Sequence, residues 1–379
     1  MPTSYPLSVL FGESAVVSCE RAVAELRAGR PIILRTADDT LFAYLALDNC
    51  TPSTLDAFAQ ATDQAHYLLL TASRMNVLCA ASNAENIRIS AQTLDYSALL
   101  GLAYQPDVAA PTHWHSADAT DAQAIALARW GLLLPCLVAA QITPVQAQLF
   151  TNSYCIQAGA VDTTQSTSAH PYRLAVKSPV PLADLGMCEV AVFRGGVALR
   201  DQVAVLIGSI DTQSSVPVRV HSSCLTGDLL GSLKCDCGDQ LRAGLRAIKN
   251  LGSGVLIYLD QEGRGTGIAA KMHAYGYQHN GMDTIDADAQ LGFAADERRF
   301  ESAAGILRAL GITQIQLLSN NPSKVEKLSA LGITVTDRLP VTGMVTKENA
   351  FYLRTKAQRA GHQLDVDSLL QHQAHSSRD

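Results

Sequence analysis

The chain is organised around residues 219–242, RVHSSCLTGDLLGSLKCDCGDQLR. Three cysteines, Cys224, Cys235 and Cys237, lie within fourteen residues of one another in this stretch. A structural zinc site is usually closed by four protein ligands, whereas three thiolates leave one position open to water. The spacing therefore predicts a catalytic zinc site. The alternative is three reduced core cysteines, because free cysteine is often buried, but the polar residues around these thiols disfavour it.

Composition sets the class of protein. A chain of 379 residues that is 47% hydrophobic is long enough for two domains with separate cores. The net charge of -6 gives no general basic field, so nucleic acid is not an expected partner and an anionic substrate must be held by local cations. The first residues do not resemble a signal peptide, and no apolar run approaches about eighteen residues, so we expect a cytoplasmic protein without a membrane span. Nine cysteines, three of them at metal-like spacing, fit a reducing compartment.

Alternating helices and strands are predicted in the first half of the chain, as in a layered α/β domain. Residues 19–30 are predicted to be helical and to lead into the strand PIILR, and Asp118 or Thr120 is expected to cap a later helix. Residues 157–181 are rich in Ser, Thr, Ala and Pro, which predicts a partly ordered linker. The predicted domains are residues 1–181 and 182–379, and the polar tail from about residue 365 is expected to be disordered.

The second half has a mixed pattern. Three predicted strands come before the cysteine stretch, and helices then alternate with strands from residue 239 onward. Residues 295–311 are expected to form one of these helices, with Asp296 and Arg298 at its start, where backbone N–H groups can bind an anion. Together the two halves predict an α+β fold class with two domains.

Four motifs in the second half identify a family resemblance. HSSCLTGDLLGSLKCDCGDQL is followed, in order, by DQEGRGTG, LGFAADER and LLSNNPSKVEKL. This series resembles GTP cyclohydrolase II, the riboflavin-pathway enzyme, over roughly residues 217–362. The resemblance implies zinc-dependent opening of the guanine imidazole ring of GTP, with release of formate and pyrophosphate. It also implies one zinc ion per chain, Mg²⁺ on the triphosphate and a homodimer.

The resemblance also implies roles for individual residues. Cys224, Cys235 and Cys237 would hold the zinc. Asp296 would be a proton acceptor, Tyr275 would help to protonate the departing nitrogen, and Arg298 would be the nucleophile toward the α-phosphate. A guanidinium essentially never deprotonates, so charge stabilisation is an equal alternative for Arg298. The residues implied in GTP binding are Arg219, Gln240, Glu262, Gly263, Arg264, Thr284, Ser319 and Lys324.

Two departures from the family pattern keep alternatives open. Ser223 stands where the family usually has Glu, and Gly265-Thr266-Gly267 replaces Asn-Ile-Gly. One alternative is therefore a divergent cyclohydrolase that stops at a formamide product or takes another purine nucleotide. A second alternative is a GTP-binding regulator without catalysis, because one domain already looks inactive.

That domain is the N-terminal one. The segments ELRAGRPIIL, LLLTASRMN and ATDAQAIALARWGLLLP resemble 3,4-dihydroxy-2-butanone 4-phosphate synthase. The acidic loop of that family is reduced here to RTADDTLFAY, and its Gly-His-Thr-Glu motif is Asp118-Ala119-Thr120-Asp121. Asp38, Asp39, His113 and His115 remain only as isolated candidates, whereas a magnesium site needs converging carboxylates. We therefore expect an inactive domain that serves as a scaffold, in dimerisation or in regulation.

Overall fold

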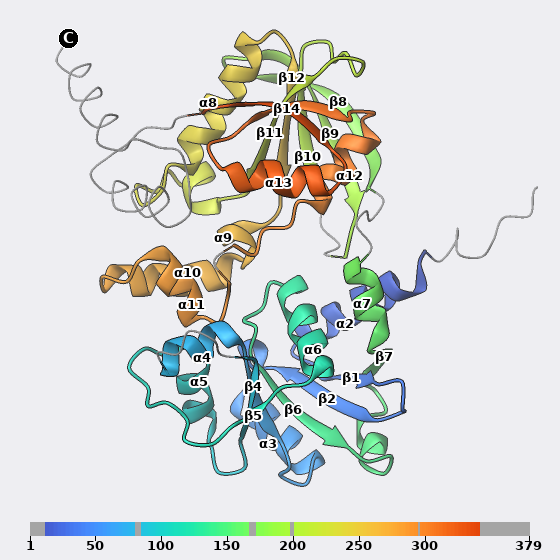
Figure 1. Cartoon of the computed structure of the whole chain (residues 1–379), viewed down its shortest axis with the longest axis vertical. Coiled ribbons are helices and arrows are strands. Elements are labelled where there is room, and N and C mark those ends of the chain that lie inside the picture. Colours follow the sequence, from blue (N-terminus) through green and yellow to red (C-terminus); the bar gives the residue numbers. More distant parts are fainter. Residues whose placement is uncertain (1–11, 80–84, 167–171, 198–200, 295, 342–379) are drawn as a thin grey trace, which may run out of the picture. The chain divides into compact units, whose positions relative to one another are not determined.

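The computed structural model describes residues 12–79, 85–166, 172–197, 201–294 and 296–341. The chain divides into two compact units, each built on a seven-stranded sheet with helices (Figure 1). The expected two-domain mixture of helices and strands is confirmed. No helix in the described ranges is both long and apolar enough to cross a membrane. Unit 1 comprises Met1–Thr167 and Ala269–Glu297, and unit 2 comprises Ser168–Ile268 and Arg298–Asp379.

The sheet of unit 1 has the order β5-β4-β3-β6-β2-β1-β7. β1 and β7 are parallel, and the other pairs of described strands are antiparallel. Its central strands are buried on both faces, which explains why β2 and β6 are almost continuously apolar. The strands are β1 (Ile32–Arg35), β2 (Leu41–Ala46), β3 (Tyr67–Leu70), β4 (Ile87–Ser90), β5 (His115–Ser116), β6 (Leu137–Ile142) and β7 (Tyr154–Gln157).

Helices cover both faces of this sheet (Figure 1). Helices α3, α4 and α5 bury apolar side chains in the core that β1, β2, β3, β4 and β6 share. Helices α2, α6 and α7 pack on one another and on β1, β2 and β7. The helices are α2 (Ser14–Arg27), α3 (Pro52–Ala61), α4 (Ala72–Cys79), α5 (Tyr96–Tyr104), α6 (Ala119–Trp130), α7 (Gly159–Ser166), α10 (Ile268–His279) and α11 (Thr284–Gln290).

A capping box begins helix α6. The Asp118 side chain accepts a hydrogen bond from the backbone N–H of Asp121 at 3.0 Å, and the Asp121 side chain accepts one from the backbone N–H of Asp118 at 3.2 Å. Two backbone donors that have no intrahelical partner are satisfied in this way. Of the two predicted caps, Asp118 and Thr120, the structure has Asp118 at the N-cap.

The sheet of unit 2 has the order β14-β13-β11-β12-β10-β9-β8. Strands β8, β9 and β10 are antiparallel, and β10 pairs antiparallel with β12. Strands β11, β12, β13 and β14 are parallel, so their carboxyl ends meet at one edge of the sheet. The strands are β8 (Tyr172–Leu182), β9 (Gly186–Gly195), β10 (Gln202–Ile207), β11 (Val216–Ser222), β12 (Gly254–Leu259), β13 (Gln314–Leu318) and β14 (Thr334–Leu339).

Helices also sandwich the second sheet. Helix α8 (Cys237–Asn250) buries Ile248 against Cys188, Ile207 and Leu256. Helices α12 (Glu301–Ala309) and α13 (Pro322–Ala330) pack on a different apolar cluster, which includes Val218, Ile257 and Leu317. The short α9 (Glu262–Gly265) follows β12. The two clusters hold the parallel strands in place, and with them the loops at their carboxyl ends.

The prediction of a partly ordered loop and linker over residues 157–181 is wrong for the described residues of that range, 157–166 and 172–181. Helix α7 and strand β8 lie in this range, and β8 pairs with β9 from Tyr172 to Leu182. The prolines in β8 are tolerated because β8 is the edge strand of its sheet, where a missing N–H donor breaks no ladder on the open side. The predicted disordered tail lies outside the described residues.

Helix α12 begins later than predicted. It starts at Glu301, so Asp296 and Arg298 precede it and are not in its first turn. Side chains occupy the backbone donors of this stretch: Ala294 N donates to Glu297 Oε1 at 2.8 Å, and Arg299 N donates to Gln261 Oε1 at 3.0 Å. These bonds compete with helical ones, and the helix begins only after the buried Phe300.

Candidate metal and nucleotide site

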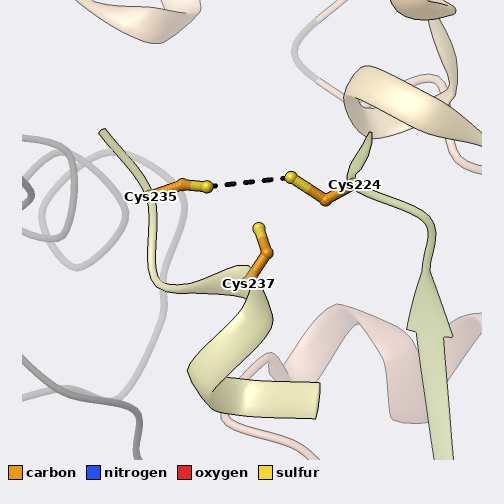
Figure 2. Close-up of side chains that lie close together, drawn as sticks. All are labelled: Cys224, Cys235 and Cys237. Atoms are coloured by element: carbon orange, nitrogen blue, oxygen red, sulfur yellow. Dashed lines mark hydrogen bonds between the residues drawn. The ribbon is translucent and has the colours of Figure 1, made fainter. Parts of the chain in front are cut away.

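Three cysteine thiols converge on one point in unit 2 (Figure 2). The sulfur atoms of Cys224, Cys235 and Cys237 all lie within 4.8 Å of one another, and Cys224 Sγ is 3.7 Å from Cys235 Sγ. That distance is far too long for a disulfide bond of about 2.05 Å. Two sulfurs that are each ~2.3 Å from a tetrahedral zinc ion lie about 3.8 Å apart. The thiols therefore fit zinc, and no other such cluster occurs among the described residues.

Gly227 leaves the space in which these thiols meet. A β-carbon at this position would lie 2.7 Å from Cys235 Sγ and 3.0 Å from Cys224 Sγ. The Gly227 backbone N–H also donates to Cys224 Sγ at 3.3 Å, a contact that favours a thiolate. The turn Leu225–Leu229 carries Gly227 from the end of β11 back over the cysteines. The glycine thus fits the metal site both sterically and electrostatically.

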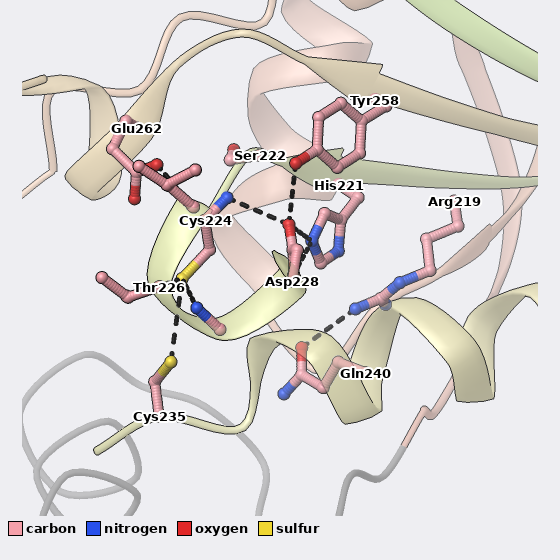
Figure 3. A network of polar contacts seen from close by, with 12 residues as sticks. Arg219, His221, Ser222, Cys224, Thr226, Asp228, Cys235, Gln240, Tyr258 and Glu262 are labelled. Atoms are coloured by element: carbon pink, nitrogen blue, oxygen red, sulfur yellow. Dashed lines mark hydrogen bonds and ion pairs between the residues drawn. The ribbon is translucent and has the colours of Figure 1, made fainter. Parts of the chain in front are cut away.

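The first cysteine is held by a buried carboxylate. Asp228 Oδ2 accepts hydrogen bonds from Cys224 N at 3.0 Å, from Tyr258 Oη at 2.9 Å and from His221 Nε2 at 3.1 Å (Figure 3). Burial lowers the pKa of His221 even though Asp228 favours its charged form, and burial raises the pKa of Tyr258. Both rings therefore act here as neutral donors. Asp228, His221 and Tyr258 were not predicted as site residues, although a carboxylate four residues after a cysteine can bond that cysteine's backbone N–H.

A chain of polar side chains reaches Asp236, the residue between the other two cysteines, and Figure 3 shows its first bond, from Arg219 to Gln240. Arg219 Nη2 donates to Gln240 Oε1 at 2.9 Å, and Gln240 Nε2 donates to Asp236, which lies between Cys235 and Cys237. Arg219 Nη1 donates to the Leu318 carbonyl at 3.1 Å. The Arg219 side chain is 4% exposed, and burial lowers its pKa to about 10. The structure thus brings Arg219 and Gln240 together beside the cysteines.

Several other sequence-predicted residues follow the parallel strands. Cys224, Glu262 and Ser319 come after β11, β12 and β13, at the shared carboxyl edge where ligands bind in sheets of this kind. Glu262 is buried, and its Oε2 accepts from Leu225 N at 2.7 Å. Ser319 Oγ accepts from Asn321 N at 3.1 Å. Lys324 is also buried, and its Nζ donates to the Val220 carbonyl at 2.9 Å.

The turn after Glu262 has an unusual backbone. Gly263 and Arg264 both have left-handed dihedral angles, with φ of 62° and 65°. Gly265 has φ of 94°, so the glycine found here in place of asparagine suits its backbone conformation. A non-glycine residue with positive φ costs conformational energy and is typical of ligand-binding turns. The turn holds Arg264 next to Glu262.

Three predicted residues belong to unit 1. Tyr275 lies in α10, with Lys271 Nζ 5.4 Å from its ring centre. Thr284 begins α11, and its hydroxyl accepts from Gln278 Nε2 at 3.3 Å. Asp296 lies near the end of Ala269–Glu297, the later segment of unit 1, whereas Arg298 belongs to unit 2.

Ser223 is the other departure from the family pattern. Its hydroxyl is buried and has no hydrogen-bond partner among the described residues.

Comparisons with known proteins extend over both units. A family model described as GTP cyclohydrolase II matches residues 173–340. Among solved structures, a two-domain 3,4-dihydroxy-2-butanone 4-phosphate synthase from A. baumannii is similar at a TM-score of 0.30 and 16% identity, covering 86% of this chain and 99% of that one.

Curated relatives match at much higher identity. The GTP cyclohydrolase-2 of Histophilus somni (strain 2336) is 44% identical over 190 residues, which cover 50% of this chain and 88% of that protein. The GTP cyclohydrolase-2 of Xylella fastidiosa (strain 9a5c) is 56% identical over 361 residues, covering 95% of this chain and 90% of that protein. With the cysteine site and the family match in unit 2, this similarity along nearly the whole chain shows that the protein belongs to the GTP cyclohydrolase II family of hydrolases.

Proposed function

We propose that the protein hydrolyses GTP and opens the guanine imidazole ring, giving a diaminopyrimidinone ribosyl phosphate, formate and pyrophosphate in riboflavin biosynthesis. The observation that carries this proposal is the convergence of three thiols at zinc-like spacing, at the carboxyl edge of the parallel strands. Three thiolates are too few to close a structural site, so the arrangement favours catalysis.

Cys224, Cys235 and Cys237 would hold the zinc ion. When bound, zinc supplies a Lewis acid and lowers the pKa of a coordinated water molecule toward neutrality. Asp228 keeps the Cys224 backbone in place, and Asp236 does the same for the turn between the other two cysteines, through its bond to Gln240. The cysteines would thus be positioned by residues that hydrogen-bond to them or to their turn, as is usual around metal sites.

The guanine base would be held by Glu262. A carboxylate can accept from both the N1–H and the neighbouring C2 amine of guanine, whereas adenine has an N1 that only accepts and no amine at C2. One oxygen of Glu262 already accepts from Leu225 N, which fixes the orientation of the carboxylate. Gly263 would allow close approach of the base to the backbone, since it has no side chain and adopts a left-handed conformation.

The triphosphate would be held by cations, Thr284, Ser319 and Mg²⁺. Arg264 and Arg298 are each partly exposed and suit direct phosphate contacts. Arg219 and Lys324 are buried and donate to backbone carbonyls, so their contribution is positive potential and support for neighbouring groups. Arg298 would stabilise charge at the α-phosphate, Asp296 would accept a proton, and Tyr275 would protonate the departing nitrogen.

The N-terminal domain would make no butanone phosphate. Asp121 is completely buried, and its carboxylate already accepts from Tyr44 Oη at 3.0 Å, from Tyr67 Oη at 2.9 Å and from Arg88. A carboxylate with these contacts has little capacity left for a metal or substrate. Incubation with ribulose 5-phosphate and Mg²⁺ should give no product above background, whereas formation at an enzymatic rate would overturn this part of the proposal.

The main test combines metal analysis with product analysis. Purified protein of known zinc content is incubated with GTP and Mg²⁺, and formate, pyrophosphate and the pyrimidine product are followed by mass spectrometry. All three products are expected, together with a cytoplasmic homodimer by cell fractionation and light scattering. Cys224→Ser should lose zinc and ring opening together. Tight GTP binding without turnover in zinc-loaded protein would instead identify a regulator.

Ser223 favours one second candidate, a divergent cyclohydrolase. Its buried hydroxyl has no partner among the described residues, at the position where the family usually carries a carboxylate. Losing a negative charge beside Cys224 alters the electrostatics of the metal site. Such an enzyme would yield a formamide product, or would turn over only another purine nucleotide. Ser223→Glu should then restore release of formate from GTP.

A further inference from the structure

Residues 269–297 lie within the part of the chain that matches the GTP cyclohydrolase II family model, but they pack as part of unit 1. This segment consists of most of α10, then α11 and the turn after it. The GTP cyclohydrolase-2 of Histophilus somni matches only half of this chain, so a protein with that name can lack a counterpart of the other half. The contacts between the N-terminal part of this chain and segment 269–297 therefore indicate what that part contributes.

Arg74 makes the most unusual of these contacts. It lies in α4 and is 1% exposed, yet among the described contacts it bonds no carboxylate. Its Nε donates to Leu102 O at 2.8 Å, and its Nη2 donates to Gly101 O at 3.1 Å and to Gln105 O at 2.7 Å, all near the end of α5. Its Nη1 donates to Gln290 O at 3.1 Å, at the end of α11. One guanidinium therefore joins the carboxyl ends of two helices.

The electrostatics of this arrangement are favourable. The last carbonyls of a helix lack intrahelical partners and carry the negative end of the helix dipole. Five donors in a rigid fork can satisfy several such carbonyls at once, which a lysine cannot do. Burial lowers the pKa of Arg74 to about 10, so the side chain remains charged at neutral pH. Its charge is thus balanced by helix ends rather than by an anion.

Further polar contacts hold the same segment. Thr71 Oγ1 donates to Gly292 O at 2.7 Å, just beyond α11. Tyr277 Oη and Gln290 Nε2 both donate to Tyr104 O, at 2.6 Å and 3.2 Å. Thr71 directly precedes α4, and Tyr104 is the last residue of α5, so these bonds tie the segment to both helices. In Figure 1, α10 and α11 lie beside α4 and α5 within this unit.

An apolar cluster completes the attachment. The N-terminal part contributes Leu134, with Tyr104 packed against the cluster. Burying this apolar surface is favourable, so the segment is held by packing as well as by hydrogen bonds. The segment contributes Ala270, Ala274, Ala287, Leu291 and Phe293.

We propose that the N-terminal part of unit 1 anchors α10 and α11 for the cyclohydrolase reaction, with Arg74 as the positioning residue for Tyr275 and Thr284. This inference rests on the function proposed above. In the described contacts Arg74 bonds neither the Tyr275 nor the Thr284 side chain. It fixes the end of α11 through Gln290, and the apolar cluster around Leu134 fixes α10. A domain without its own reaction would then be retained because it holds a catalytic segment in place.

The test compares two arginines in the full-length protein. Arg74→Met removes the anchor, and Arg88→Met is the matched control, because Arg88 pairs with Asp118 and Asp121 elsewhere in unit 1. Both variants should lower the melting temperature. Only Arg74→Met should speed hydrogen exchange in peptides of residues 269–292 and lower kcat/KM for GTP by about 10- to 100-fold, since small misplacements of catalytic groups have effects of that size.

Additional variants separate positioning from general damage. Zinc content should stay unchanged in Arg74→Met, because the thiols lie in the other unit. Arg74→Lys should recover part of the activity, since it keeps the charge but not the fork. If Arg74→Met does not fold, Thr71→Val removes a single bond to Gly292 and should show a smaller effect of the same kind.

Three outcomes would overturn the inference. Equal losses of kcat/KM in Arg74→Met and Arg88→Met would mean general destabilisation. Faster exchange in the segment with unchanged kcat/KM would mean that its position does not matter for the reaction. Unchanged exchange in Arg74→Met would mean that Arg74 is not the anchor. By contrast, absence of GTP turnover in the unaltered chain would refute the proposed function, while the exchange comparison would still report on the anchor.

Discussion

At the scale of single residues, the cluster of three thiols is supported by neighbouring residues that are not cysteines. Asp228 holds the backbone of Cys224, and Gly227 leaves room for the sulfurs. Gln240 connects the buried Arg219 to Asp236. Each of these residues can be changed without removing a thiol, so their effects on zinc affinity can be measured separately.

Gly227→Ala should weaken zinc binding. The new β-carbon would lie within 3.0 Å of two cysteine sulfurs, so the thiols must move apart. Changes around a metal site typically reduce affinity by about 10- to 100-fold. Competition with a chelator of known affinity measures the effect. Gly159→Ala is the control, since a β-carbon there meets no atom within 4 Å, and equal zinc affinity in the two variants would contradict the steric argument.

Gln240→Leu should also release zinc faster. The substitution leaves Arg219 Nη2 and Asp236 without their shared partner, and an unsatisfied buried donor costs about 1–3 kcal/mol. The turn between Cys235 and Cys237 should therefore become less ordered. Zinc release can be followed by stopped-flow with a coloured chelator. Arg242→Gln, on the same helix and in an exposed pair with Asp239, should leave the rate unchanged; a raised KM for GTP with normal zinc release in Gln240→Leu would favour a purely substrate-binding role.

At the scale of elements, helix ends and strand ends organise both units. The four parallel strands of unit 2 bring Cys224, Glu262 and Ser319 to one edge. In unit 1, the end of α11 is fixed by Arg74, and α6 begins with a capping box. Termini matter because their backbone groups lack intrahelical partners and must be satisfied from outside.

Asp118→Ala should destabilise α6. It removes the cap and the ion pair with Arg88 together, and the loss of a cap alone costs about 1 kcal/mol. Asp118→Asn keeps the capping oxygen and loses only the charge, so it should cost less. Calorimetric melting of the full chain measures both. Equal losses in the two variants would show that the ion pair, and not the cap, stabilises this helix.

At the scale of the whole molecule, the chain forms two units, each with its own sheet and its own core. The core of unit 2 consists of Val218, Ile257, Leu317 and other apolar residues of the sheet and its helices. The thiols lie outside this cluster: Cys224 follows β11, Cys235 precedes α8, and Cys237 is the first residue of α8. The metal and the fold are therefore expected to be largely independent.

Removal of zinc should abolish activity and spare most of the structure. Dialysis against a strong chelator should leave the far-ultraviolet circular dichroism nearly unchanged, because the sheet core of unit 2 contains none of the three cysteines. Activity with GTP should return on addition of zinc and should not return with Mg²⁺ alone. Full turnover by metal-free protein, or global unfolding on chelation, would each contradict this expectation.

Local sequence patterns predicted the cysteine cluster, a helix cap and several helices and strands. The spacing of Cys224, Cys235 and Cys237 predicted their convergence, because the chain between them is short enough for only a few turns. Asp118 was predictable as a cap from its place before an apolar helix. Apolar periodicity also predicted α8, β12 and α13, since amphipathic segments bury one face whatever their partners are.

Only the tertiary structure decided the remaining features. Sequence alone did not predict that Arg219 Nη1 donates to the Leu318 carbonyl or that Lys324 Nζ donates to the Val220 carbonyl. The start of α12 depends on Gln261, and the attachment of α10 and α11 depends on Arg74. These contacts join residues far apart in the chain, and no local pattern encodes a partner that folding alone brings near. Sequence therefore determined the cysteine cluster and most elements, while long-range packing decided which polar groups bond to one another and which unit contains each segment.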